Sequence, residues 1–118
     1  MDVISAEEYE PVSFFEVEPT PTDEDVPWPY NDYVYQIQRG DVSMSCAIAP
    51  AYKDVRIILK FFDRRIYELN SVGVRDVRYE NKGGDETLEI ILNESESILL
   101  RVKPNIEILH NHSAQFET

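Results

Sequence analysis

The chain has 118 residues, a formal net charge of −12 at pH 7, 42% hydrophobic residues and 29% charged residues. This length is enough for one domain with a sizeable core and leaves little room for a second independent domain. The acidic balance argues against nucleic acids and anionic membranes as partners, because both are bound through Lys and Arg. Positively charged partners are the natural exception.

The sequence also predicts a soluble, cytoplasmic protein. Its first residues lack the basic and apolar regions of a signal peptide, and no apolar stretch approaches the ~20 residues that span a bilayer. Cys46 is the only cysteine, so the chain cannot form an intramolecular disulfide, as is usual for cytosolic proteins. Cys46 falls on the same side of a predicted strand as Val42, Met44 and Ile48, so we expect it in the core.

The charge is concentrated in residues 1–32, which we call the acidic segment. It holds ten carboxylates and no basic residue, so the remainder of the chain contributes only −2. Five of the seven prolines also lie here, and each biases the preceding residue away from helix. Ser5 and Glu8 could form a capping box, but Pro11 follows too soon for a helix to grow. We therefore expect irregular structure with at most one brief helical turn.

Beyond residue 32 the hydrophobic pattern acquires the two-residue period of β-strands. Turn signals such as those at residues 39–41 and 81–85 separate the strands, and an irregular stretch near residues 72–80 suits a bulge. The predicted strands cover residues 33–38, 42–49, 55–61, 66–69, 72–80, 87–92, 98–102 and 106–110. Their connections are too short for crossover helices, which predicts antiparallel pairing.

The predicted fold class is all-β: an antiparallel meander forming a small sandwich or open barrel, with an irregular acidic Pro-rich N-terminal segment. Residues 1–32 are expected to dock on the body. Residues 33–110 form the β domain, and residues 111–118 form a loose C-terminal tail. No second domain and no internal repeat is predicted.

Several predicted strands carry apolar residues on the row that should face water. A patch of this kind is normally covered in a soluble protein. The cover could be the aromatic side chains of the acidic segment, a partner or a second copy, or else the row belongs to the core of a second sheet. The residues of this row are Ile58, Phe62, Ile91, Leu99 and Leu109, and the candidate covering aromatics are Phe14, Phe15, Trp28 and Tyr30.

Few side chains suggest catalysis or metal binding. His110 and His112 would share one side of a strand, but two ligands with no nearby Cys or Asp do not complete a metal site. The run of carboxylates at residues 23–25 lacks the alternating ligands and central Gly of a calcium loop. No Gly-rich phosphate loop and no activated nucleophile is recognisable. We predict no catalytic residue, no metal site and no cofactor, and hence a protein that is not an enzyme.

The favoured hypothesis is a small acidic protein-binding module that engages a basic partner, in the manner of an immunity protein or inhibitor that occupies a nuclease's site. Clustered carboxylates attract a cationic partner at long range, while buried aromatic side chains supply most of the short-range binding energy. The predicted contact residues are Asp23, Glu24, Asp25, Trp28, Tyr30 and Asp32.

Two alternatives stay open at this point. The first is a small barrel or sandwich that holds an apolar ligand between its sheets, with Tyr33, Tyr35 or Tyr67 as polar contacts. The second is a homodimeric structural protein that buries the apolar outer row. An acidic segment that serves only solubility is the simplest explanation of the charge.

Overall fold

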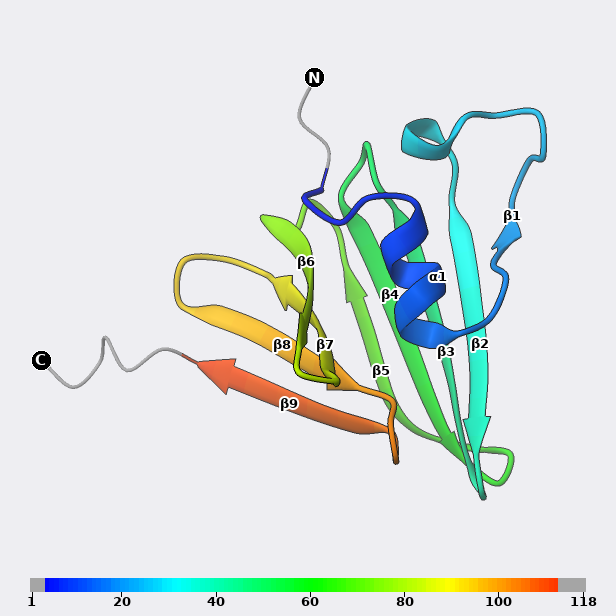
Figure 1. Ribbon diagram of the computed structural model, residues 1–118, viewed down its shortest axis with the longest axis vertical. Helices are drawn as coiled ribbons and strands as arrows, with labels where there is room; N and C mark the ends of the chain where they lie inside the picture. Colours follow the sequence, from blue (N-terminus) through cyan, green and yellow to red (C-terminus); the bar gives the residue numbers. More distant parts are fainter. Residues whose placement is uncertain (1–3, 113–118) are drawn as a thin grey trace, which may run out of the picture.

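The computed structural model describes residues 4–112 and contains nine strands, one α-helix and one 3₁₀ helix (Figure 1). The helices are α1 (Tyr9–Phe15) and η1 (Trp28–Tyr30). The strands are β1 (Thr20–Pro21), β2 (Tyr33–Arg39), β3 (Val42–Ala49), β4 (Asp54–Phe61), β5 (Arg64–Ser71), β6 (Asp76–Lys82), β7 (Asp85–Ile91), β8 (Glu96–Arg101) and β9 (Glu107–His112). Neither helix in this part of the chain is long and apolar enough to cross a membrane.

The strands form two antiparallel sheets in chain order, β1-β2-β3-β4-β5 and β6-β7-β8-β9. Within each sheet, every strand pairs with the next one along the chain, as short connections require. Figure 1 shows the two sheets facing each other at an angle and opening apart at one side. The predicted all-β meander and sandwich-like architecture are therefore confirmed.

The core lies between the sheets because alternate residues of each strand point inward. Tyr35 on β2 faces Cys46 on β3, which in turn faces Ile57 on β4, and all three side chains are fully buried. The prediction that Cys46 belongs to the core is confirmed, and burial raises the pKa of its thiol to about 12. The second sheet supplies Leu88, Ile90, Ile98 and Leu100, which are buried to the same degree.

Helix α1 lies between the two sheets and closes their open side (Figure 1). Phe14 and Phe15 at its end are fully buried, and the Phe15 ring stacks on Tyr35 with 5.0 Å between ring centroids. The sequence predicted at most one brief turn here, whereas the helix spans seven residues and continues through Pro11. Pro11 occupies the first turn, where a backbone N–H has no intrahelical acceptor, so the missing donor costs no hydrogen bond.

The acidic-segment aromatics do not cover the outer row of the sheets, which corrects that expectation. Phe14 and Phe15 pack in the core instead. The sheets meet at an angle, so apolar residues of their inner rows are uncovered on the open side until α1 packs there (Figure 1). On the outer rows, Leu99 is half-buried within its own sheet, whereas Phe62 and Leu109 are exposed. The apolar outer row is therefore only partly covered within the described chain.

The predicted bulge is displaced from its expected position. The β4–β5 pairing shifts register between Leu59 and Lys60, so Ile66 is the extra residue and its side chain is exposed. Strand β6 pairs with β7 without a shift, and the irregular stretch before it contains a turn at Gly73, with φ of +62°. Strand β9 continues to His112, while residues 113–118 of the predicted tail lie outside the described residues. The division of the chain at residues 32 and 110 stays a prediction.

The packing of α1 predicts a large loss of stability for Phe15→Ala. Removing a fully buried ring that stacks on Tyr35 leaves a cavity, and we expect the free energy of unfolding to fall by about 3–5 kcal/mol. Tyr9→Ala is the matched control, because Tyr9 lies on the same helix and is 64% exposed. We expect it to change stability by no more than about 0.5 kcal/mol in urea denaturation. Equal losses for the two variants would contradict this account of α1.

Candidate functional site

Asn31 closes the loop of the acidic segment that precedes β2. This residue is almost fully buried, with 4% exposure. Its side-chain amide donates to the backbone oxygens of Asp23, at 2.5 Å, and Val26, at 3.2 Å. Its side-chain oxygen accepts from the backbone N–H of Asp32 at 2.8 Å. The loop between residues 22 and 32 is thus closed on itself, and its carboxylates have defined positions.

Two further contacts join the start of the chain to the four-stranded sheet. The hydroxyl and backbone N–H of Ser5 both donate to the carboxylate of Asp76 on β6. Lys103 Nζ lies 2.9 Å from Glu16, at the end of α1, and 2.6 Å from Glu86 on β7. The acidic segment is therefore part of the folded body from residue 4 onward.

A hollow opens where this loop meets the outer face of the five-stranded sheet. It consists of two adjoining depressions of about 230 and 320 Å³ that share Asp32, Ala49 and Tyr52, and we call it the Tyr30–Tyr52 hollow. The side chains of Tyr30 and Tyr52 are 51% and 67% exposed. Ala51 N–H donates to Pro29 O at 2.7 Å, which ties the β3–β4 turn to η1. This bond keeps the two tyrosines beside the same depression.

Carboxylates surround the Tyr30–Tyr52 hollow. Asp23 lines one depression, Asp54 lines the other, and Asp32 lies between them. Asp32 pairs with Arg56 at 3.2 Å, but both side chains are partly exposed, so the pair contributes little stability. Tyrosine rings beside carboxylates form a suitable environment for a cationic side chain, through cation–π attraction and direct ion pairing. The hollow therefore combines two exposed aromatic rings with three carboxylates.

The structure brings together half of the predicted contact residues. Asp23, Tyr30 and Asp32 line the hollow, and Glu24 and Asp25 are exposed in the same loop. The remaining predicted contact residue lies differently: the Trp28 ring is half-buried and packs on Tyr33, with 4.9 Å between centroids. This contact fixes the start of η1 against β2. Whether these six residues contact a partner stays a prediction.

The residues that sequence analysis missed come from elsewhere in the chain. Tyr52 and Asp54 lie in and after the β3–β4 turn, and Val72, which is 82% exposed, follows β5. An aromatic residue two positions after Pro50, in a turn, was the only available signal for Tyr52. Their closeness to the acidic segment depends on sheet pairing, which the local sequence does not reveal.

The histidine pair and the carboxylate run do not form a metal centre. His110 Nε2 lies 2.6 Å from Glu96 on the neighbouring strand. Between residues 4 and 112 there is no group of three or more His, Cys, Asp and Glu side chains arranged to hold a metal ion. The observed contact of His110 is a cross-strand hydrogen bond with Glu96 at the edge of the four-stranded sheet.

The space between the sheets is occupied by side chains. Tyr33 and Tyr35, proposed above as polar contacts for an apolar ligand, are 9% and 0% exposed and pack in the core. The Tyr35 hydroxyl is buried with no hydrogen-bond partner in the part of the chain that the structure describes, and burial raises its pKa. This packing favours a filled core. The ligand-binding and homodimer alternatives stay untested predictions.

Comparisons with known proteins identify a similar fold. The chain matches no family model and no curated protein. Among solved structures, it resembles a chain of the contact-dependent growth inhibition toxin and immunity protein complex from Klebsiella pneumoniae 342. The TM-score is 0.74 with 19% sequence identity, and the match covers 90% of this chain and 93% of that chain. At this identity the likeness establishes a shared fold along nearly the whole length.

The Ser5–Asp76 contact predicts a stability loss in acid. Partial burial raises the pKa of Asp76. Hydrogen bonds from Ser5 and from Arg78 lower it by a larger amount, so the net pKa lies below its usual 3.8. Because the folded-state pKa is lowered, this contribution to stability is complete above the unfolded-state pKa and is lost as pH falls through the folded-state pKa.

We therefore expect Asp76→Asn to lower the melting temperature most near pH 7, with the difference from wild type shrinking below about pH 4. Thermal unfolding between pH 7 and pH 2.5 measures this effect. Asp63→Asn, in the exposed β4–β5 turn, serves as the control. A constant difference between Asp76→Asn and wild type across that range would show that the carboxylate does not anchor Ser5.

Proposed function

We propose that this chain is an immunity protein that binds and neutralises a toxin with a basic contact surface. The observation that carries the proposal is the Tyr30–Tyr52 hollow, where exposed tyrosines stand among Asp23, Asp32 and Asp54. The shared fold with a chain of a toxin and immunity protein complex supports the same class of function. In this proposal the chain acts as a binding protein in the cytoplasm and catalyses no reaction.

Electrostatic attraction and aromatic anchoring would act at different stages of binding. Ten carboxylates within 32 residues create a negative field that accelerates encounter with a cationic protein. Once the partner is in contact, Tyr30 and Tyr52 provide rigid side chains whose apolar rings lose water and whose hydroxyls still form hydrogen bonds. Because Asn31 fixes the loop beforehand, little ordering would be required on binding.

The proposed contact set extends the one expected from the sequence. It contains the exposed carboxylates of the loop, Asp23, Glu24, Asp25 and Asp32, together with Tyr30. Tyr52 and Asp54 join it from the β3–β4 turn and the start of β4. Trp28 supports this surface through its packing on Tyr33.

The first test is protection from a toxin. The probe is the product of the reading frame next to this one, expressed in a sensitive host with and without this chain. We expect growth arrest that co-expression of this chain relieves, and a stable complex of the two purified proteins. A harmless neighbouring product, or a toxic one that this chain neither binds nor neutralises, would contradict the proposal.

Substitution of the tyrosines tests which surface binds. Tyr30→Ala and Tyr52→Ala should each raise the dissociation constant by about 30-fold, which corresponds to about 2 kcal/mol at a central interface residue. Tyr9→Ala removes an equally exposed tyrosine from α1 and should leave binding unchanged. Isothermal titration calorimetry with the purified toxin measures all three. Tight binding by both hollow variants would exclude this surface.

Salt dependence tests the role of charge. The association rate should fall by at least tenfold between 20 mM and 500 mM NaCl, because screening shortens the reach of the carboxylates. Asp23→Asn combined with Asp32→Asn should lower the rate at 20 mM NaCl and reduce its salt dependence. Stopped-flow fluorescence provides the rates, and a rate indifferent to salt would show that the partner is not attracted by charge.

A further inference from the structure

The outer face of the five-stranded sheet continues from the Tyr30–Tyr52 hollow to the opposite end of β3. The outward row of β3 consists only of small residues, and we call it the β3 trench: Ser43, Ser45, Ala47 and Ala49. Ala47 and Ala49 line the hollow itself. Because alternate strand residues are about 6.8 Å apart, the trench is about 20 Å long.

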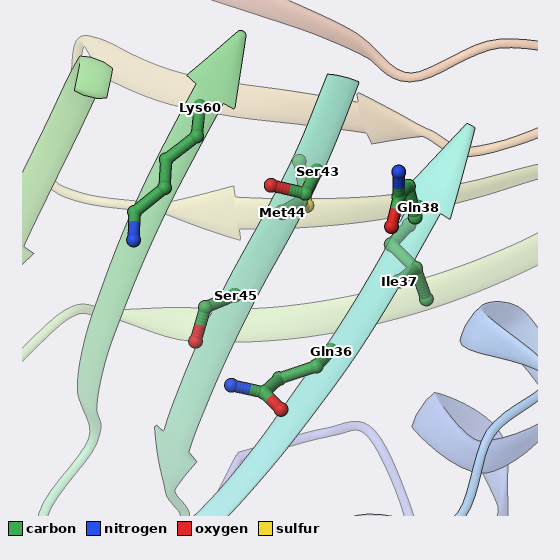
Figure 2. Close-up of a pocket in the computed structure, with 7 residues that line it drawn as sticks. All are labelled: Gln36, Ile37, Gln38, Ser43, Met44, Ser45 and Lys60. Carbon is green, nitrogen blue, oxygen red and sulfur yellow. The ribbon is translucent and has the colours of Figure 1, made fainter. Parts of the chain in front are cut away.

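Longer side chains form the two walls of the trench at its far end. Gln36 and Gln38 stand on β2 and Lys60 stands on β4, around a depression of about 350 Å³. Figure 2 shows the hydroxyls of Ser43 and Ser45 on the middle strand, between Gln36 on one side and Lys60 on the other. A protruding group of a partner could therefore reach the sheet backbone between these walls.

The two ends of this face have opposite charge. Asp23, Asp32 and Asp54 line the hollow at one end together with Arg56, so three carboxylates and one guanidinium leave that end net negative. Lys60 stands at the other end, and its ammonium group forms no ion pair with any carboxylate of residues 4–112. A partner that covers both ends must be basic at the hollow and carry a carboxylate opposite Lys60.

The area of the face also matters, because the hollow alone is small for a stable complex. A specific interface buries about 800 Å² on each partner. The outer face over β2 to β5 measures about 500 Å² from strand rise and spacing. The outer face and the loop of the acidic segment together offer a partner a larger contact surface than the hollow alone.

We infer that the toxin partner extends from the Tyr30–Tyr52 hollow along the β3 trench to Lys60, covering the outer face of the five-stranded sheet. This inference rests on the proposed function and adds the extent, direction and charge pattern of the contact. The basic part of the toxin lies at the acidic end of the trench, and an acidic group of the toxin pairs with Lys60.

Filling the trench tests the inference. Ser45→Trp places a large ring in the depression, and we expect the dissociation constant for the neighbouring toxin to rise at least 100-fold. Ser97→Trp is the matched control, since Ser97 is also half-buried and lines an open depression of about 300 Å³ on the other sheet. We expect it to bind within threefold of wild type. Circular dichroism and melting temperature establish that both variants are folded.

Charge reversal gives a second, independent measurement should Ser45→Trp fail to fold. Lys60→Glu should raise the dissociation constant about tenfold at 50 mM NaCl and less at 500 mM, while Lys82→Glu on β6 should have no effect. If wild type binds the toxin and Tyr30→Ala weakens binding, but the folded trench variants bind like wild type, this inference is wrong and the proposed function stands. If wild type does not bind the toxin at all, the proposed function itself fails.

Discussion

The stack of Phe15 on Tyr35 is the contact on which the rest of the structure depends. The two sheets meet at an angle, and their inner rows would be open to water at one side without α1. By placing Phe14 and Phe15 in that opening, the chain completes its core with residues from its most charged segment. Burial of two aromatic rings supplies free energy that holds the nine carboxylates of residues 4–32 close to one body despite their mutual repulsion.

The docking of α1 is accompanied by a defined placement of the carboxylates that follow it in the chain. Once α1 is seated, β1 pairs with β2, and Asn31 closes the loop that carries Asp23 and Asp32. The loop then lies beside the β3–β4 turn, where Tyr52 completes the hollow. In the proposed complex, a loop that is already closed would lose less conformational entropy on binding than a free tail.

The alternation of apolar residues made the strands and the meander predictable, because strand pairing in a meander follows chain order. The predicted extent of the helix and the position of the bulge were less accurate, because backbone geometry overrides the hydrophobic pattern there. Pro11 is compatible with α1 only because of its position in the first turn, and the bulge at Ile66 lies one hairpin earlier than expected. The sequence offered Phe14 and Phe15 as a cover for the outer rows, whereas both pack on the inner rows, since the angle between the sheets is a property of packing.

By itself the sequence determined the fold class, because the two-residue hydrophobic period is a local property. It also determined that negative charge is concentrated in residues 1–32, because the positions of Asp, Glu, Lys and Arg can be read directly. It also indicated three residues of the hollow, Asp23, Tyr30 and Asp32. Only the tertiary structure brought Tyr52 and Asp54 to the same place and aligned Ser43, Ser45, Ala47 and Ala49 into one trench. Those neighbours depend on register and on the docking of α1, which arise from contacts between residues far apart in the chain.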